Sequence, residues 1–237
     1  MIASTVERPT VHHELIEIPI AGTRLSGHLA MPVAARGLVV VASGDGERLY
    51  SGGNEAIAAE LVRAGFGTLV VELLTPEEVV EDAESSELRF NQTLVAARVV
   101  RVVSWVRSQL AFVGLEIGCL AGGLCAGSVL AAAAVLPAVR SVVCRGARFE
   151  LAEGLLDRVH APVLLIVGQR DTAHLAANRR ALSRLPRTSQ LRVVNDARHL
   201  VDEPRDLERI ASETAAWFGR TLTRGERLQT RVLAARV

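Results

Sequence analysis

The sequence predicts an α/β fold, in which a mostly parallel sheet of about eight strands carries helices on both faces. Short, wholly apolar runs such as Gly37–Ala42 and Val163–Gly168 are typical of strands buried on both sides of a parallel sheet. Segments with helical periodicity separate these runs, as successive βαβ units require. The alternating segments His13–Ile20 and Arg24–Met31 flank Ala21-Gly22-Thr23 and predict an antiparallel hairpin ahead of the parallel strands.

The remaining elements follow from the period of the apolar residues and from turn and cap residues. Asn54 is expected to cap the first helix, and Gly65 to follow its end. The acidic stretch Thr75–Glu87 predicts a solvated connection, and the space between 144 and 163 allows a short helix only, hence little or no lid. We expect further strands at 67–73, 115–121, 139–144 and 191–194, and helices at 54–64, 88–110, 126–136, 174–185 and 204–222.

Length and composition favour one domain spanning 1–237, with residues 1–10 and 224–237 as flexible or docking tails. Hydrophobic residues make up 49%, which is enough for a sizeable core, but no charge-free apolar run reaches the roughly 18 residues of a membrane span. The net charge is +1 and no aromatic residues lie among the basic ones, so neither nucleic acid nor a membrane surface is expected as a partner. Met1–His13 lacks the pattern of a secretory signal, which favours a cytoplasmic location.

The cysteines predict reduced thiols and neither a metal nor another cofactor. There are three of them, an odd number without metal-type spacing. Cys119 and Cys144 lie inside expected strands and are interpreted as core residues. All 27 basic residues are arginine, so Schiff-base chemistry on lysine is excluded.

The stretch Ile117–Ser128 predicts a sharp turn between a strand and a helix. Its centre reads Gly123-x-Cys125-x-Gly127, and small flanking residues allow such a turn to hold its central residue in a strained conformation. We therefore expect Cys125 to stand at a helix N-terminus, where backbone N–H groups and the helix dipole favour a thiolate.

Two further side chains follow expected strands at the same edge of the sheet, where ligands gather. Asp171 follows the run 163–168, and His199 follows the run 191–194. With Cys125 as nucleophile, His199 would take the thiol proton and Asp171 would orient the imidazole. His174, close to Asp171 in the sequence, is the rival histidine. Each residue also has a structural alternative: a core cysteine, a loop histidine and a helix N-cap aspartate.

Backbone N–H groups near the turn are candidates for stabilising an oxyanion. Ala126 follows the cysteine, and Gly44 and Asp45 follow the first apolar strand. One such donor is worth roughly 3 kcal/mol in acyl-transfer enzymes. A guanidinium suits a substrate carboxylate, and four arginines are candidates for the rim of the pocket. They are Arg48, Arg145, Arg148 and Arg198.

These motifs resemble the dienelactone hydrolase family of the α/β-hydrolase superfamily. The similarity runs from about residue 37 to 222 and rests on four stretches: Val70–Pro76, Gly123–Gly127, Ala161–Asp171 and Ala197–Leu200. The resemblance implies the α/β-hydrolase fold and a Cys–His–Asp triad, which falls on Cys125, His199 and Asp171 here.

The chain departs from the family in the loop after the first parallel strand. That loop commonly begins with His-Gly, and here it is Ser43-Gly44. In lactone-opening members a glutamate in the loop helps control the thiol, and neither position carries one.

The sequence thus predicts a hydrolase that opens a small ester or lactone, with or without a carboxylate, through a cysteine acyl-thioester. A thioesterase or acyl-transfer enzyme with the same triad is the first alternative. The second is a catalytically silent binding protein in which Cys125 lines the pocket. A homodimer stays open as the assembly.

Overall fold

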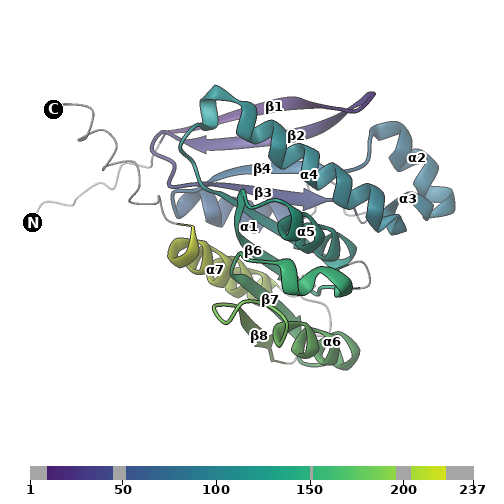
Figure 1. Ribbon diagram of the computed structural model, residues 1–237. Coiled ribbons are helices and arrows are strands. Elements are labelled where there is room, and N and C mark those ends of the chain that lie inside the picture. Colours follow the sequence, from purple (N-terminus) through teal and green to yellow (C-terminus); the bar gives the residue numbers. More distant parts are fainter. Residues whose placement is uncertain (1–9, 45–51, 150–151, 196–203, 223–237) are drawn as a thin grey trace, which may run out of the picture.

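The structure is a computed structural model that describes residues 10–44, 52–149, 152–195 and 204–222. Its framework is an eight-stranded sheet with the order β1-β2-β4-β3-β5-β6-β7-β8 (Figure 1). The strands are β1 (Val11–Ile20), β2 (Thr23–Pro32), β3 (Leu38–Ser43), β4 (Gly67–Glu72), β5 (Ile117–Gly122), β6 (Val139–Arg145), β7 (Val163–Gly168) and β8 (Gln190–Val194).

The sheet is parallel except at one edge. β1 pairs antiparallel with β2, and β2 pairs antiparallel with β4, while every other neighbouring pair is parallel. The carboxyl ends of the six parallel strands therefore lie along one edge of the sheet, which is called the carboxyl edge below.

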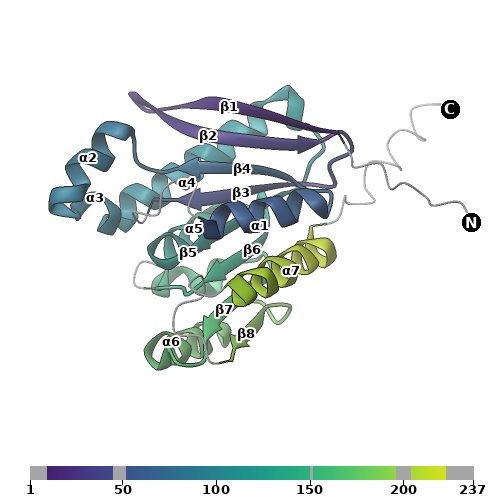
Figure 2. The same ribbon diagram turned by 180° about the vertical axis from the view of Figure 1, so that it is seen from behind.

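Helices cover both faces of the sheet (Figures 1 and 2). One face packs against α1 (Gly52–Arg63) and α7 (Pro204–Thr221), which lie side by side. The other face packs against α4 (Gln92–Ser108), α5 (Gly123–Val135) and α6 (Thr172–Leu182). The shorter elements are α2 (Pro76–Ser85), α3 (Glu87–Phe90) and the 3-10 helices η1 (Leu110–Phe112) and η2 (Glu153–Arg158). No helix in the described ranges is both long and apolar enough to span a membrane.

The expected sheet is confirmed, including its strand number, its parallel pairing and the N-terminal hairpin. The apolar runs determine this result because both faces of β3, β5 and β7 are covered, so every side chain of β3 and β7 is buried. Between β6 and β7 the helix of the described residues is the short η2, in agreement with little or no lid.

The stretch 75–87 is largely exposed, as expected of a solvated connection, but it contains a helix, α2, that the sequence analysis did not predict. Thr75 and Glu78 make a capping box, and Pro76 is the first residue of the helix. Arg98 of α4 then donates two hydrogen bonds to Glu78, both 2.6 Å long, and a third to the carbonyl oxygen of Leu73. Glu78 thus makes a local cap and an ion pair with a distant, buried arginine, whereas Glu77, Glu81 and Glu84 are exposed to solvent.

Two boundaries also differ from the expectation. The predicted helix at 88–110 is interrupted, because Asn91 caps α4 and ends α3. Asn54 is not the cap of α1: it lies inside the first turn, and its side chain accepts a hydrogen bond from Arg145. The predicted tails at 1–10 and 224–237 lie almost entirely outside the described residues.

Candidate active site

The predicted turn around Gly123–Gly127, called the elbow below, lies at the carboxyl edge, where β5 passes directly into α5. Gly122 is the N-cap residue with φ −114° and ψ 165°, and Cys125 is the third residue of the helix. The expected strain is not at the cysteine. Ser86 is the one residue other than glycine with a positive φ in the described ranges, whereas Gly123 takes a left-handed φ of 51°. A glycine two positions before the cysteine therefore makes the bend.

The second glycine of the motif gives room to a neighbouring backbone. A Cβ atom on Gly127 would lie 2.5 Å from the carbonyl oxygen of Arg148. The backbone N–H of Arg148 in turn donates to the carbonyl oxygen of Gly123 at 3.4 Å. The chain that leaves β6 thus packs directly on the first turn of α5 and helps to fix the orientation of Cys125.

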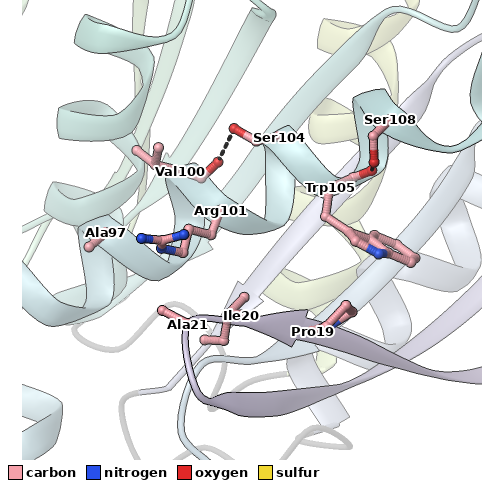
Figure 3. Close-up of a pocket in the computed structure, with 9 residues that line it drawn as sticks. All are labelled: Pro19, Ile20, Ala21, Ala97, Val100, Arg101, Ser104, Trp105 and Ser108. Carbon is pink, nitrogen blue, oxygen red and sulfur yellow. Dashed lines mark hydrogen bonds between the residues drawn. The ribbon is translucent and has the colours of Figure 1, made fainter.

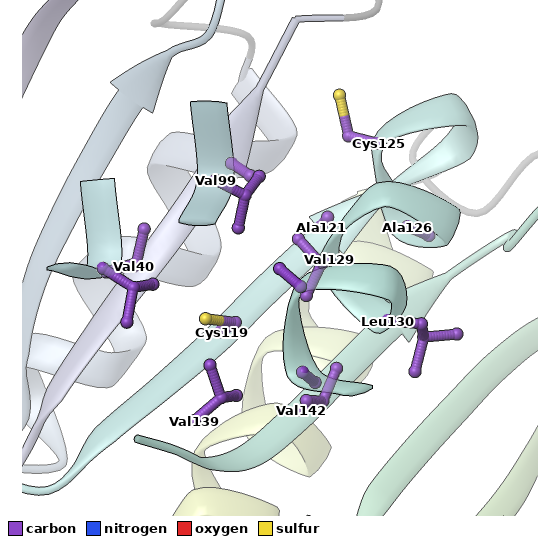
Figure 4. Close-up of a cluster of buried hydrophobic side chains, with 14 of the residues drawn as sticks. Val40, Val99, Cys119, Ala121, Cys125, Ala126, Val129, Leu130, Val139 and Val142 are labelled. Atoms are coloured by element: carbon purple, nitrogen blue, oxygen red, sulfur yellow. The ribbon is translucent and has the colours of Figure 1, made fainter. Parts of the chain in front are cut away.

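The thiol of Cys125 is enclosed by the ends of two other strands. The residue is 1% exposed, and Figure 4 shows its sulfur pointing away from the labelled core side chains. A Cβ atom on Gly44, which follows β3, would lie 3.6 Å from the Cys125 Sγ. The same point is 3.1 Å from the Leu73 Cβ and 3.6 Å from the Glu72 Oε1. Because glycine has no side chain, the Cys125 sulfur and the Glu72 carboxylate both border the space beside Gly44.

Sequence reasoning missed Glu72. It is the last residue of β4 and pairs in register with Ser43 of β3, so the parallel sheet brings it to the carboxyl edge. The Glu72 Oε1 and the Cys125 Sγ each lie 3.6 Å from the Cβ position of Gly44, so they are at most twice that distance apart. The carboxylate therefore lies close to the thiol. The available signal was a single acidic residue at the end of an otherwise apolar strand.

The other two cysteines are buried in the sheet, as expected. Cys119 of β5 and Cys144 of β6 are fully buried and not in a disulfide. Burial raises the pKa of the Cys119 thiol to about 12 and also raises the pKa of Cys144. The Cys144 thiol donates to the carbonyl oxygen of Ala126 at 3.8 Å, beneath the first turn of α5. Both thiols are therefore structural.

Asp171 lies at the carboxyl end of β7, two strands from β5, and its side chain contacts the rival histidine. Asp171 caps α6, where its Oδ1 accepts from the backbone N–H of His174 at 3.3 Å. Its Oδ2 also lies 2.6 Å from the His174 Nδ1. The predicted base, His199, lies outside the described residues.

The candidate arginines differ in their surroundings. Arg145 ends β6 and is 4% exposed, so its guanidinium is buried next to Gly122 and does not lie at the rim of a pocket. The Arg148 side chain is exposed. The other expected site residues outside the described ranges are Asp45, Arg48 and Arg198.

A cavity of about 620 Å³ lies elsewhere, between β1 and α4 (Figure 3). It is open to solvent, and its lining combines apolar side chains with Ser104, Ser108 and Arg101. None of Gly44, Glu72, Cys125 or Asp171 lines it, so it is separate from the site around the thiol. The lining residues are Pro19, Ile20, Ala21, Ala97, Val100, Arg101, Ser104, Trp105 and Ser108.

Comparison with known proteins places this geometry among hydrolases. No protein-family model matches the chain. The structure resembles the crystal structure of a dienelactone hydrolase from Anabaena variabilis, with a TM-score of 0.86 and 35% identity over 90% of this chain and 99% of that one. Est1E from Butyrivibrio proteoclasticus has a TM-score of 0.72 at 15% identity over 87% of this chain and 98% of its own, and shows the fold alone.

A second kind of relative carries a different name. Two Mycobacterium tuberculosis proteins, provisionally named phosphoribosyl transferases, are 39% identical over 211 residues, or 89% of this chain. The match covers 47% of each of those proteins, so the chain spans about half the length of these curated relatives. The Anabaena protein, by contrast, matches over nearly its full length and at more than 30% identity. The chain therefore belongs to the dienelactone hydrolase family of α/β-hydrolases.

Proposed function

We propose that this chain hydrolyses a small ester or lactone, with Cys125 as nucleophile, His199 as general base and Asp171 orienting the imidazole. The position of Cys125 carries the proposal. It is the third residue of α5, directly after a central parallel strand, and its Sγ lies beside Gly44 at the carboxyl edge. That edge is where ligands bind in open α/β sheets.

The reaction would proceed in two balanced steps. In the first, Sγ bonds to the carbonyl carbon while His199 takes the thiol proton and returns it to the departing alcohol oxygen. In the second, His199 removes a proton from water, the hydroxide attacks the acyl-thioester, and the thiol is restored with release of the acid. A thiolate is a better leaving group than an amine, so esters, lactones and thioesters suit this nucleophile better than amides.

Two backbone N–H groups are proposed to stabilise the oxyanion of each tetrahedral intermediate. Ala126 directly follows Cys125 near the N-terminus of α5, so its N–H lies next to the thiol-bearing residue. Gly44 approaches the thiol from the end of β3. Asp45 is kept as the alternative donor on that side. Each donor is expected to contribute roughly 100-fold or more to kcat.

Asp171 remains able to orient a second imidazole although it already binds His174. A carboxylate has two oxygens and about four acceptor positions, and His174 uses one position on each oxygen. His174 is the alternative base, favoured by its 2.6 Å contact with Asp171. The two histidines are distinguished by mutation, as described in the Discussion.

We propose that the phosphoribosyl transferase name of the mycobacterial relatives refers to the half that this chain does not match. This chain matches about half of each mycobacterial protein and also matches a dienelactone hydrolase over almost all of that protein. We therefore attribute ester or lactone chemistry to the shared half.

The direct test compares wild type with Cys125→Ala on chromogenic short-chain esters and on lactones. We expect wild type to turn over and to form an acyl adduct on Cys125, detected by mass spectrometry of trapped intermediates. Cys125→Ala should lose both. Turnover at the wild-type rate in Cys125→Ala would remove Cys125 from the mechanism. Binding of esters by wild type without any hydrolysis would support the silent binding protein instead, and faster turnover of thioesters or transfer to an added alcohol would support the acyl-transfer alternative.

A further inference from the structure

A buried cation lies directly beneath the elbow. Arg145 is the last residue of β6 and pairs in register with Gly122, the last residue of β5. Only 4% of Arg145 is exposed. Arginine is rarely buried to this extent unless its guanidinium has specific partners, because removing a charge from water is costly.

The guanidinium joins two elements of the proposed site. Its Nη2 donates a 2.6 Å hydrogen bond to the Oδ1 of Asn54, which is 3% exposed and lies in the first turn of α1. On its other side it packs against the elbow. A Cβ atom on Gly122 would lie 3.2 Å from the Nη2 and 3.5 Å from the Cζ of Arg145. One side chain thus touches both the residue that precedes the elbow and the start of α1.

We infer that Arg145 is a positioning residue that holds the elbow at a fixed distance from the start of α1 through its bond to Asn54. This inference rests on the proposed function. The two proposed oxyanion donors belong to different elements, since Ala126 lies in α5 and Gly44 follows β3. Since β3 pairs directly with β5, the spacing of these donors depends on the angle at which the elbow carries α5 away from the end of β5.

The chemistry of the contact suits this role. A hydrogen bond from a guanidinium is charge-assisted and roughly twice as strong as one between neutral groups. The planar guanidinium also has a rigid shape, so it fixes direction as well as distance. The absence of a side chain at Gly122 leaves room for the guanidinium at this position. A displacement of about 1 Å in such an arrangement can cost roughly 100-fold in rate.

The test removes the acceptor and then restores it. Asn54→Leu keeps a similar volume without the oxygen, and Asn54→Asp keeps an acceptor for Arg145. We expect Asn54→Leu to lower kcat for a neutral chromogenic ester by about 10- to 100-fold, with KM changed by less than about 2-fold. Asn54→Asp should recover most of that loss. Arg140→Met, an exposed position on the same strand at the opposite edge, is the matched control and should leave kcat unchanged.

A second measurement separates donor positioning from general damage. Alkylation of Cys125 by iodoacetamide develops no carbonyl oxyanion, so its rate should stay within about 2-fold of wild type in Asn54→Leu. Arg145→Met should lower kcat similarly, and because both changes break the hydrogen bond between Arg145 and Asn54, the double variant should lose no more than the larger single loss. If Asn54→Leu does not fold, Arg145→Met gives the same readouts.

Three results would overturn the inference. The first is wild-type kcat in a folded Asn54→Leu or Arg145→Met. The second is a rise in KM confined to esters that bear a carboxylate, which would make Arg145 a substrate contact. The third is an equal loss of alkylation and turnover. These results differ from a failure of the proposed function, in which turnover would continue in Cys125→Ala.

Discussion

The carbonyl oxygen of Arg148 lies 2.5 Å from the point that a Cβ atom on Gly127 would occupy, so the elbow is closed by a backbone contact that only glycine permits. Gly127→Ala must displace the chain after β6 or the first turn of α5. We expect a loss of about 2 kcal/mol in the free energy of unfolding, measured with urea, together with reduced turnover. Gly154→Ala is the control, since nothing lies within 4 Å of the added methyl group. Equal stability of the two variants would contradict the close contact.

Glu72 is expected to restrain the reactivity of Cys125. A carboxylate close to the sulfur disfavours the negatively charged thiolate. Glu72→Gln removes that charge, so the alkylation rate of Cys125 at neutral pH should rise by about 3- to 10-fold. Glu81→Gln, on the exposed side of α2, should have no effect. A rate that is unchanged or lower in Glu72→Gln would show that the carboxylate does not act on the thiol in this way.

The general base is identified by changing each histidine in turn. His199→Gln should reduce kcat by about 100-fold or more, since general-base catalysis contributes that much in comparable enzymes. His174→Gln should reduce kcat by less than about 5-fold, because His174 would serve only to hold the Asp171 carboxylate through its ring nitrogen. The reverse order of effects in ester hydrolysis assays would assign the role of base to His174.

The three thiols should react in a fixed order. Iodoacetamide is expected to label Cys125 first, because burial raises the pKa of Cys119 to about 12 and that of Cys144 as well. Peptide mapping after a short exposure measures this order. In denaturant the three residues should react at similar rates, which serves as the control. First labelling of Cys119 or Cys144 in the native protein would contradict the assigned roles.

The ion pair between Glu78 and Arg98 should make stability depend on pH below about 4.5. The hydrogen bonds from Arg98 hold the pKa of Glu78 below its ordinary value. This contribution is therefore fully present above the unfolded-state pKa and is lost as the pH falls through the lower folded-state pKa. Arg98→Met should cost about 2 kcal/mol at pH 7 and should weaken the acid dependence of the melting temperature. An unaltered acid dependence would show that other carboxylates dominate it.

The sequence by itself determined the sheet, because strands that are covered on both faces must be apolar along their whole length. β3 and β7 consist of such runs, and their positions follow from the order of apolar residues along the chain. The elbow was also predictable, since few local structures require small residues on both sides of a central residue between a strand and a helix. The sequence pattern wrongly placed the strained backbone conformation at Cys125, whereas Gly123 adopts it.

Only the tertiary structure decided which polar groups meet. Glu72 reaches the thiol because β4 and β5 both flank β3, and that strand order cannot be deduced from either segment alone. Arg145 was a candidate for the rim of the pocket, but at the end of β6 its guanidinium lies next to Gly122 and binds Asn54. Arg98, 20 residues from Glu78 in the sequence, likewise binds it and holds α2 against α4. Local pattern fixes which residues are apolar and where the chain turns, whereas the partners of buried charges depend on packing between segments that are distant in the chain.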